Sequence, residues 1–446
     1  MVDFCLVYKK KTGYNCLASK TEGGMNRDNL KQIMTDQKEM YLNHPIVCRN
    51  YQLEDCVNYC FVGIRRTGKS YMMYQQIRNL TENGVPSEQI VYINFEDERL
   101  LEMTSEDLNS ILEIGLETAG TGNRPYLFLD EIQNIEGWEK FVRRVADMKY
   151  RVNITGSNSR MLSSEIASTL GGRFLIVQIY PYDFSEFLLA QGKTKDYLGV
   201  IGTTDRADVI NSYGQYVRFG AFPELIDIRN KREYLNSIYQ TIYLGDIISR
   251  NKITNDFAVR LILKKIAESV MKPLSYSRLA HILKSAGAAI GKQTVINYIG
   301  YMIDSYLLFT VHNYAAKLVD KETSPKYYFM DTGLLGLLLM DSVTAQLENL
   351  AAIELIRRYG TENVFYFENN VEIDFYVPNE NLAVQVSYSI LDQMDTRERE
   401  LGAFVKLKSF IPEAKCLLIT NSEEADVECE GVRVSVVPMW KWLLSR

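Results

Sequence analysis

Residues 59–76 read YCFVGIRRTGKSYMMYQQ, and this stretch decides how the rest of the chain is interpreted. A short apolar segment, residues 59–62, leads into a loop that runs from Gly63 to Ser70. An amphipathic pattern begins directly after the loop. The spacing G-x-x-x-x-G-K-[ST] between an expected strand and an expected helix is the context that a phosphate-binding loop requires. The alternative is a chance match in a basic surface loop.

The chemistry of such a loop is specific. Glycines let the backbone turn tightly, so that successive N–H groups converge on phosphate oxygens at the positive end of the following helix. We expect Lys69 to reach the β- and γ-phosphates and the Ser70 hydroxyl to occupy one Mg²⁺ position. The residues expected to bind the nucleotide are consecutive: Gly63, Ile64, Arg65, Arg66, Thr67, Gly68, Lys69, Ser70 and Tyr71.

A second motif, YLFLDE at residues 126–131, is an apolar run that ends in two carboxylates. A buried parallel strand would deliver Asp130 to the Mg²⁺ shell at the carboxyl edge of the sheet, where α/β proteins bind ligands. Glu131 would then orient or deprotonate the attacking water. A surface turn after an unrelated core strand is the alternative, but agreement with the upstream loop favours the catalytic interpretation.

Polar residues near two later strands are further candidates. Ser157 and Asn158 follow the expected strand at residues 151–156, where they would contact the γ-phosphate or the lytic water. A plain turn is the alternative for this segment. Arg173 or Arg160 is expected to compensate charge on the phosphates, as an arginine finger does, unless it is simply solvated.

The strands alternate with helices up to about residue 180, which predicts an α/β fold: a parallel sheet with helices on both faces. Residues 181–255 are expected to be a helical lid or linker. Residues 256–330 are expected to form three helices and a two-stranded hairpin, the order of a winged-helix module. Its third helix would enter the major groove if the module bound DNA, but it offers almost no charge for phosphate contacts. A packing or regulatory module is the alternative.

The last unit, residues 331–446, is a small α+β domain with three carboxylates, Glu348, Glu372 and Asp374, on an expected helix and strand. A Mg²⁺-dependent restriction-type nuclease combines such groups with Glu-x-Lys on the next strand. Here those positions are Gln385 and Ser387. A neutral amide is a poor Mg²⁺ ligand and serine carries no positive charge, so we expect a nuclease-like fold that does not cleave.

The composition is that of an ordinary globular protein, with 46% hydrophobic and 24% charged residues and a net charge of −6. This mild acidity gives no overall basic field to attract nucleic acid. Seven scattered cysteines and three histidines form no zinc pattern, which favours reduced thiols in a cytoplasmic protein. No apolar run reaches membrane-spanning length. Residues 1–24 are a poorly patterned extension, and Met25 is a candidate start codon.

Nine short stretches carry a resemblance to a known family: GIRRTGKS (63–70), YLFLDEIQ (126–133), ITGSNSRML (154–162), GGRF (171–174), AFPE (221–224), YLGDIISR (243–250), YYFMDTGL (327–334), LEN (347–349) and EIDF (372–375). The chain resembles prokaryotic AAA-type ATPases that pair an N-terminal phosphate-loop domain with a C-terminal domain of unknown function. The resemblance implies a winged helix and a restriction-endonuclease-like fold in the C-terminal region. It also implies an AAA-type ATPase domain at residues 25–180, with Asp130 for magnesium and Glu131 for catalysis.

These observations predict an ATPase that binds ATP and Mg²⁺ and repositions its C-terminal modules on a nucleic-acid or protein partner. Nucleic acid would be contacted through residues 291–330 and the C-terminal domain, and a homo-oligomer is a further expectation. The alternatives are an ATP-gated DNA nuclease and a nucleotide-dependent scaffold with little turnover.

Overall fold

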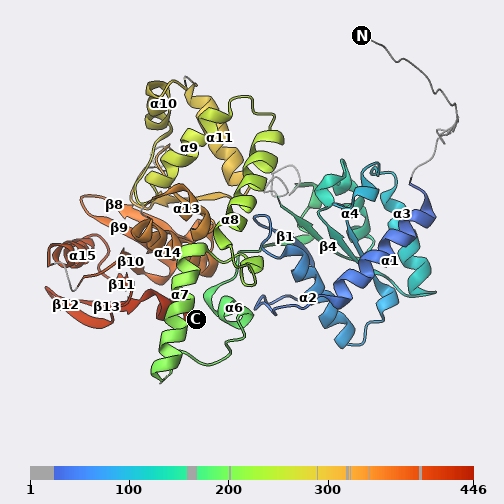
Figure 1. Ribbon diagram of the computed structural model, residues 1–446, viewed down its shortest axis with the longest axis horizontal. Coiled ribbons are helices and arrows are strands. Elements are labelled where there is room, and N and C mark those ends of the chain that lie inside the picture. Colours follow the sequence, from blue (N-terminus) through green and yellow to red (C-terminus); the bar gives the residue numbers. More distant parts are fainter. Residues whose placement is uncertain are drawn as a thin grey trace, which may run out of the picture.

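The computed structural model describes residues 25–445, apart from residues 158–167, 200–201, 289, 318–320, 322, 341 and 391–393. The described strands form two sheets, which lie apart in Figure 1 with helices between them. One has five strands in the order β2-β3-β4-β1-β5, and the other has eight in the order β12-β13-β11-β10-β9-β8-β6-β7. The order of the first sheet brings the strands of the two sequence motifs close together.

The five strands of the first sheet are all parallel to their neighbours. They are β1 (Asn58–Val62), β2 (Ile90–Asn94), β3 (Tyr126–Asp130), β4 (Arg151–Gly156) and β5 (Phe174–Gln178). In a parallel sheet, the carboxyl ends of the strands lie at one edge. The loop at residues 63–70 and the Asp130–Glu131 pair therefore emerge on the same side of the sheet. The predicted parallel sheet is confirmed.

Helices cover both faces of this sheet, as predicted (Figure 1). The four helices are α1 (Arg27–Asn43), α2 (Lys69–Glu82), α3 (Leu108–Ala119) and α4 (Trp138–Asp147). Phe61 and Phe128 pack with α2 on one face, whereas Val62 and Leu129 pack with α3 and α4 on the other. Alternate strand residues point to opposite faces, so strands that are covered on both sides read as continuous apolar runs.

A helical region connects the two sheets and includes α6 (Phe184–Ala190), α7 (Thr203–Phe219) and α8 (Lys231–Gln240). Helix α8 continues without a break into a π-helical segment, η6 (Thr241–Ser249). Six 3₁₀ turns complete the described connections: η1 (Ser87–Gln89), η2 (Glu98–Leu100), η3 (Ile132–Asn134), η5 (Pro223–Leu225), η7 (Thr361–Asn363) and η8 (Pro378–Glu380).

The next segment contains three helices and a hairpin, in the predicted order. These are α9 (Asp256–Glu268), α10 (Tyr276–Ser285), α11 (Lys292–Asp304), β6 (Leu308–Asn313) and β7 (Lys326–Phe329). Strand β6 also pairs in parallel with a later strand, at His312 with Phe365. The hairpin is therefore the edge of the eight-stranded sheet, and the predicted boundary at residue 330 divides one continuous sheet. The name winged helix remains a prediction.

The remaining elements complete this mixed sheet and its helices. They are α13 (Thr332–Leu338), α14 (Val343–Tyr359), β8 (Phe365–Glu368), β9 (Glu372–Val377), β10 (Leu382–Ser387), α15 (Met394–Leu407), β11 (Lys415–Thr420), β12 (Ala425–Cys429), β13 (Val432–Pro438) and α16 (Met439–Leu444). The middle of α14 is buried on all sides, because every residue from Gln346 to Ile356 is buried. Its buried polar side chains therefore need partners within the protein.

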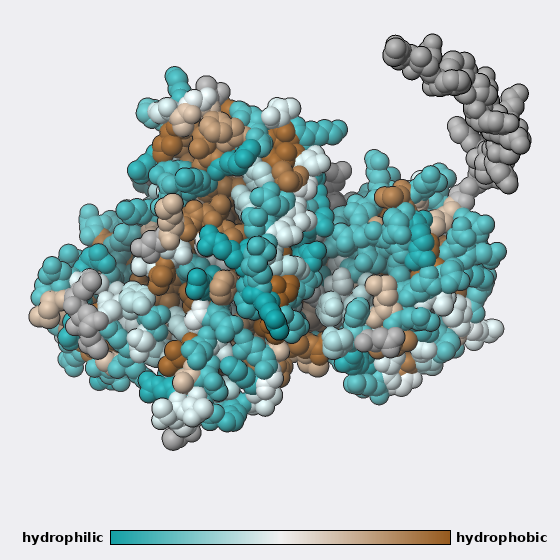
Figure 2. Space-filling model, in the orientation of Figure 1, coloured by the Kyte–Doolittle hydropathy of each residue, from teal (hydrophilic) through white to brown (hydrophobic). Residues whose placement is uncertain are grey.

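The surface is mostly hydrophilic over the first sheet, whereas apolar side chains gather near α9–α11 in the view of Figure 2. Of the helices in the described ranges, none has both the length and the apolar character needed to cross a membrane.

Asp331 joins the connecting helices to the C-terminal sheet. Its fully buried carboxylate accepts hydrogen bonds from the backbone N–H groups of Gly333 and Leu334, which caps α13, and from that of Ala221 at 2.8 Å. Burial raises the pKa of Asp331 to about 6, against the lowering effect of these three bonds. Gly220 adopts φ +75°, and a Cβ atom there would collide with the Asp331 carboxylate.

We expect Asp331→Ala to lower the free energy of unfolding by about 2 to 4 kcal/mol, because buried N–H groups lose their acceptor. Chemical denaturation followed by circular dichroism measures this change. The control is Asp395→Ala, in the exposed first turn of α15, which should shift stability by no more than about 0.5 kcal/mol. Equal effects of the two variants would contradict the role given to Asp331.

Candidate nucleotide-binding site

The loop after β1 has the backbone that a phosphate-binding loop needs. Gly63 adopts φ +145° and lies against the chain that leaves β5, so that a Cβ atom would overlap the Ile179 carbonyl oxygen. Gly68 adopts φ +89° and is the N-cap of α2. Both conformations are strained for residues with a side chain. The two motif glycines are therefore required by geometry, and α2 begins at Lys69 with its N-terminus at the loop.

Lys69 is held across its own loop. Its buried ammonium group donates to the carbonyl oxygens of Gly63 at 3.2 Å and Ile64 at 3.3 Å, and lies 3.6 Å from Glu131 Oε1. The Thr67 hydroxyl also donates to the Ile64 carbonyl, at 2.9 Å. These contacts close the loop around the lysine and place a positive charge at its centre.

Asp130 lies at the end of β3 and is fully buried. Its carboxylate accepts hydrogen bonds from the hydroxyls of Tyr92, at 2.7 Å, and Thr155. Burial, with help from the neighbouring Glu131 carboxylate, raises the pKa of Asp130, while hydrogen bonds from Ser70, Thr155 and Tyr92 oppose the rise. Ser70 and Asp130 therefore lie together, although they are 60 residues apart in the chain.

Glu131 adopts a left-handed backbone conformation, with φ 53° and ψ 40°, which is uncommon for a residue other than glycine. Its backbone N–H donates to the Thr155 hydroxyl at 2.8 Å, and its carboxylate accepts a hydrogen bond from the Gln133 side chain. Burial acts to raise the pKa of Glu131, but the Lys69 ammonium and its other neighbours outweigh it, so the pKa is lowered. Glu131 is therefore ionised at neutral pH.

Ser157 follows β4 and is buried beside Glu131, where it helps to lower the pKa of that carboxyl. Its hydroxyl has no hydrogen bond of good geometry within the described part of the chain. Asn158 and Arg160, the other candidates in this segment, lie outside the described residues. Tyr71 is half-exposed on the first turn of α2, with its ring 5.3 Å from that of Tyr74.

The prediction for Arg173 is wrong within this chain. Arg173 immediately precedes β5, whose first residue pairs with Asn58 at the start of β1, so it lies at the amino edge of the sheet. The loop at residues 63–70 follows the opposite, carboxyl edge. Arg173 instead forms an ion pair with Asp147 and donates to the carbonyl oxygen of Gly171.

Arg65 and Arg66 point away from the centre of the loop toward the connecting helices. Arg65 forms an ion pair with buried Asp246 of η6 at 2.7 Å. Arg66 contacts Glu224 at 2.6 Å and the Tyr234 hydroxyl at 2.7 Å. The middle of the phosphate-binding loop is therefore bonded directly to α8 and η6.

Sequence reasoning missed the residues that hold the two carboxylates. Tyr92 and Thr155 lie on strands that flank β3, and Thr155 bonds both Asp130 and the backbone of Glu131. The sequence feature that could have identified Thr155 is its place near the end of β4. Once β4 is placed beside β3, Thr155 is level with the two carboxylates. The polar residues predicted for this edge, Ser157 and Asn158, lie further along the chain.

The C-terminal sheet contains a second charged cluster, with a lysine at its centre. The Lys326 ammonium, fully buried on β7, lies 3.0 Å from Glu372, 3.9 Å from Glu348 and 4.0 Å from Asp374. The Gln385 side chain is bonded to the backbone of β9 and accepts from the Asp374 N–H at 2.7 Å. The three carboxylates predicted from the sequence do lie together, but an ammonium group takes the place where a metal ion would neutralise them.

Electrostatics agree with this description. Burial raises the pKa of both Asp374 and Glu348, and the Lys326 ammonium opposes the rise. Within the described residues, no group of three or more His, Cys, Asp or Glu side chains has the arrangement of a metal site.

We expect Lys326→Met to lower the free energy of unfolding by about 3 to 5 kcal/mol, because it leaves buried carboxylates without a counter-charge. Removing the ammonium raises the pKa values of Asp374 and Glu348 further, so the folded variant takes up protons as the pH falls. The destabilisation should therefore be larger at about pH 8 than at about pH 5, in denaturant titrations at both values.

The control for this experiment is Lys441→Met. Lys441 forms an ion pair with Glu424 at 2.6 Å near the surface, and its loss should cost no more than about 1 kcal/mol. A Lys326→Met protein as stable as this control at both pH values would show that the ammonium does not neutralise the cluster.

Comparisons with known proteins agree with this geometry. Residues 58–188 match a family model described as an AAA domain, and residues 210–345 match one described as a domain of unknown function. An uncharacterized protein of Methanocaldococcus jannaschii is 32% identical over 430 residues, covering 93% of this chain and 95% of the relative. An uncharacterized protein of Haemophilus influenzae is 28% identical over 388 residues, covering 85% and 92%.

Among solved structures, a Walker-type ATPase of Pyrococcus abyssi matches with 13% identity and a TM-score of 0.40, covering 69% of this chain and 95% of that chain. The predicted family is confirmed, whereas the winged-helix and nuclease-like assignments remain predictions. The chain belongs to the family of the Methanocaldococcus jannaschii relative, and its residues 58–188 match the AAA domain.

Proposed function

We propose that this protein hydrolyses ATP with Mg²⁺ and uses the nucleotide state to reposition its C-terminal helices and sheet on a partner. One observation carries the proposal: Lys69, Ser70, Asp130 and Glu131 converge at the carboxyl edge of the first sheet. These groups come from a loop and a strand that are separate in sequence. Their meeting supplies a cation for phosphate, oxygen ligands for a metal and a carboxylate for water.

The loop would bind the triphosphate through its backbone N–H groups and the Lys69 ammonium. In the present structure this ammonium is bonded to carbonyl oxygens of its own loop, and phosphate oxygens would replace those weaker acceptors. The Ser70 hydroxyl and the Asp130 carboxylate are hard oxygen donors, which suit Mg²⁺. A bound Mg²⁺ supplies charge neutralisation for the phosphates.

Glu131 would position the attacking water. Because its pKa is lowered, the carboxylate is ionised but is a weak base. It is therefore better suited to orient the water by hydrogen bonding than to remove a proton early. The Gln133 side chain and the Thr155 hydroxyl hold Glu131 in position. Its left-handed backbone conformation is strained, and such strained residues cluster at functional sites.

The repositioning step is supported by the two loop arginines. Arg65 and Arg66 connect the loop to Asp246, Glu224 and Tyr234 in the helical region. Phosphates bound in the loop would shift the backbone that carries these two arginines and so change their contacts with the carboxylates. Nucleotide binding would then change the position or the mobility of α8 and η6, which lead into the C-terminal helices.

The partner is proposed to be nucleic acid or protein. Lys292, Gln293 and Asn297 are exposed on α11, where a nucleic acid could contact them. The ATP-gated nuclease alternative finds no support in the second cluster, because Lys326 lies among its carboxylates. The scaffold alternative differs from the proposal only in its turnover rate.

Two variants test the ATPase proposal. Lys69→Ala should abolish binding of ATP, because the loop loses its only ammonium. Glu131→Gln should bind ATP with nearly wild-type affinity but reduce turnover by about 100-fold or more, because the amide orients water poorly. Calorimetry with ATP and a phosphate-release assay measure the two effects.

The control is Arg173→Ala, which changes a charged residue of the same domain at the opposite edge of the sheet. It should bind and hydrolyse ATP like the wild type. Undiminished turnover in Glu131→Gln would contradict the role of Glu131. Tight ATP binding with negligible turnover in the wild type would favour the scaffold.

The loop-to-helix connection is tested by Asp246→Asn. This variant should bind ATP but lose most of the nucleotide-dependent change in hydrogen exchange over residues 231–249, because Arg65 no longer has a charged partner there. The matched control is Asp256→Asn, which disrupts an exposed ion pair with Arg260 on α9. A nucleotide response of Asp246→Asn equal to that of the control would rule out this connection.

A further inference from the structure

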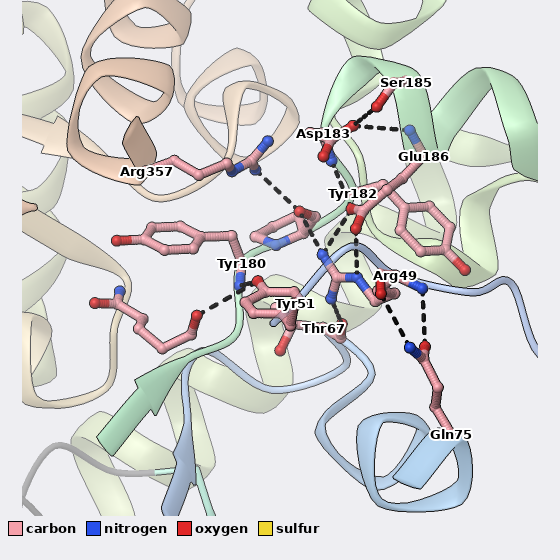
Figure 3. A network of polar contacts seen from close by, with 12 residues as sticks. Arg49, Tyr51, Thr67, Gln75, Tyr180, Tyr182, Asp183, Ser185, Glu186 and Arg357 are labelled. Atoms are coloured by element: carbon pink, nitrogen blue, oxygen red, sulfur yellow. Dashed lines mark hydrogen bonds and ion pairs between the residues drawn. The ribbon is translucent and has the colours of Figure 1, made fainter. Parts of the chain in front are cut away.

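A buried arginine links the segment before β1 to the phosphate-binding loop. The Gln75 side chain of α2 pairs with the backbone of Arg49, accepting from its N–H at 2.8 Å and donating to its carbonyl at 2.9 Å. The Arg49 guanidinium donates to the Thr67 carbonyl of the loop at 3.1 Å. Two contacts therefore hold Arg49 against the nucleotide-binding elements, as Figure 3 shows.

The same guanidinium contacts the connection that leaves β5. It forms a two-point contact with the Glu186 carboxylate at 2.8 and 3.0 Å, and it donates to the Pro181 carbonyl at 3.3 Å. The rings of Tyr51 and Tyr182 lie 5.2 and 5.4 Å from its central carbon. A planar guanidinium held in this way has a fixed orientation.

A second arginine reaches the same carbonyl from the C-terminal part of the protein. Arg357 of α14 donates to the Pro181 carbonyl at 3.0 Å and contacts Glu354 at 3.3 Å. Its central carbon lies 5.3 Å from the Tyr180 ring. The Pro181 oxygen therefore accepts one hydrogen bond from the AAA domain and one from α14.

This shared carbonyl lies beside a cleft of about 840 Å³. Its lining includes Arg49, Tyr51, Gln178 and Tyr180 on one side and Arg357 and Gly360 on the other. Beside this cleft, the Pro181 carbonyl joins the segment after β5 both to Arg49 and to α14, so a change in the position of either partner can act through it.

We propose that Arg49 is a positioning residue for the phosphate-binding loop and that the Arg49–Pro181–Arg357 chain couples ATP binding to the placement of α14. The inference rests on the proposed function, since it assumes that the loop binds ATP. A shift of Thr67 on nucleotide binding moves Arg49 and so strengthens or weakens the hydrogen bond from Arg49 to the Pro181 oxygen. Because Arg357 donates to the same oxygen, its hydrogen bond changes in turn. Coupling of this kind is reciprocal, so a change at Arg357 alters the affinity of the distant loop for ATP.

The test compares two neighbouring arginines of α14. Arg357→Gln should change the Kd for a non-hydrolysable ATP analogue with Mg²⁺ by about 3-fold to 30-fold. Arg358→Gln is the matched control, because Arg358 bonds to Glu354 and the Trp442 carbonyl. It should leave the Kd within about 2-fold of the wild type. Calorimetry measures the affinities, and thermal unfolding checks that each variant is folded.

A double-mutant cycle completes the experiment. Arg49→Lys keeps the charge but loses the two-point contact, and it should weaken analogue binding by itself. In the Arg49→Lys protein, Arg357→Gln should change the Kd for the analogue by a smaller factor than it does in the wild type. The reason is that the Arg49–Pro181–Arg357 contacts are already disrupted. If Arg357→Gln does not fold, Arg357→Lys takes its place, since lysine keeps the charge but lacks the planar guanidinium whose two terminal nitrogens reach Glu354 and Pro181 separately.

The outcomes separate this inference from the proposed function. No binding of the analogue by the wild type would overturn both. Binding by the wild type, with equal Kd values for the Arg357 and Arg358 variants or with additive effects in the cycle, would overturn the coupling alone.

Discussion

The parallel register of β1, β3 and β4 is the constraint on which the candidate site depends. It brings the phosphate-binding loop, Asp130 and Thr155 to one edge of the sheet. Because the strands are covered on both faces, their residues are mostly apolar, and Asp130 and Thr155 lie near the carboxyl ends of their strands. Both carboxylates, Asp130 and Glu131, are buried. Hydrogen bonds from Tyr92 and Thr155 hold the Asp130 carboxylate in place, and the Thr155 hydroxyl accepts from the backbone N–H of Glu131.

Three arginines connect the nucleotide site to other segments of the chain. Arg65 and Arg66 connect the loop to the helical region, and Arg49 connects it to the segment after β5. A guanidinium group can donate to several acceptors in one plane, so it can hold together three segments of the chain that meet at one point. In the C-terminal cluster an ammonium group has a different task, since Lys326 neutralises three carboxylates from a single point.

The sequence predicted those parts of the structure that depend on local patterns. Short stretches of consecutive residues were enough to predict the loop, the strand before Asp130 and the order of strands and helices. The partners of these residues could not be predicted in the same way. Thr155, Arg49 and Lys326 act through neighbours that only the folded sheets bring close, and Arg173 failed because its strand begins at the opposite edge. The lysine of the C-terminal cluster comes from β7, on a separate stretch of the chain from Glu372 and Asp374.

The burial of the central turns of α14, residues 346–356, has a mechanical consequence. A helix enclosed on every side in a close-packed interior cannot rotate or slide by itself, because its neighbours have no free volume to accommodate the change. A pull on Arg357 near its C-terminal end is therefore resisted by the whole eight-stranded layer. A displacement transmitted to this helix would therefore move it together with the neighbours that enclose it, as one rigid body.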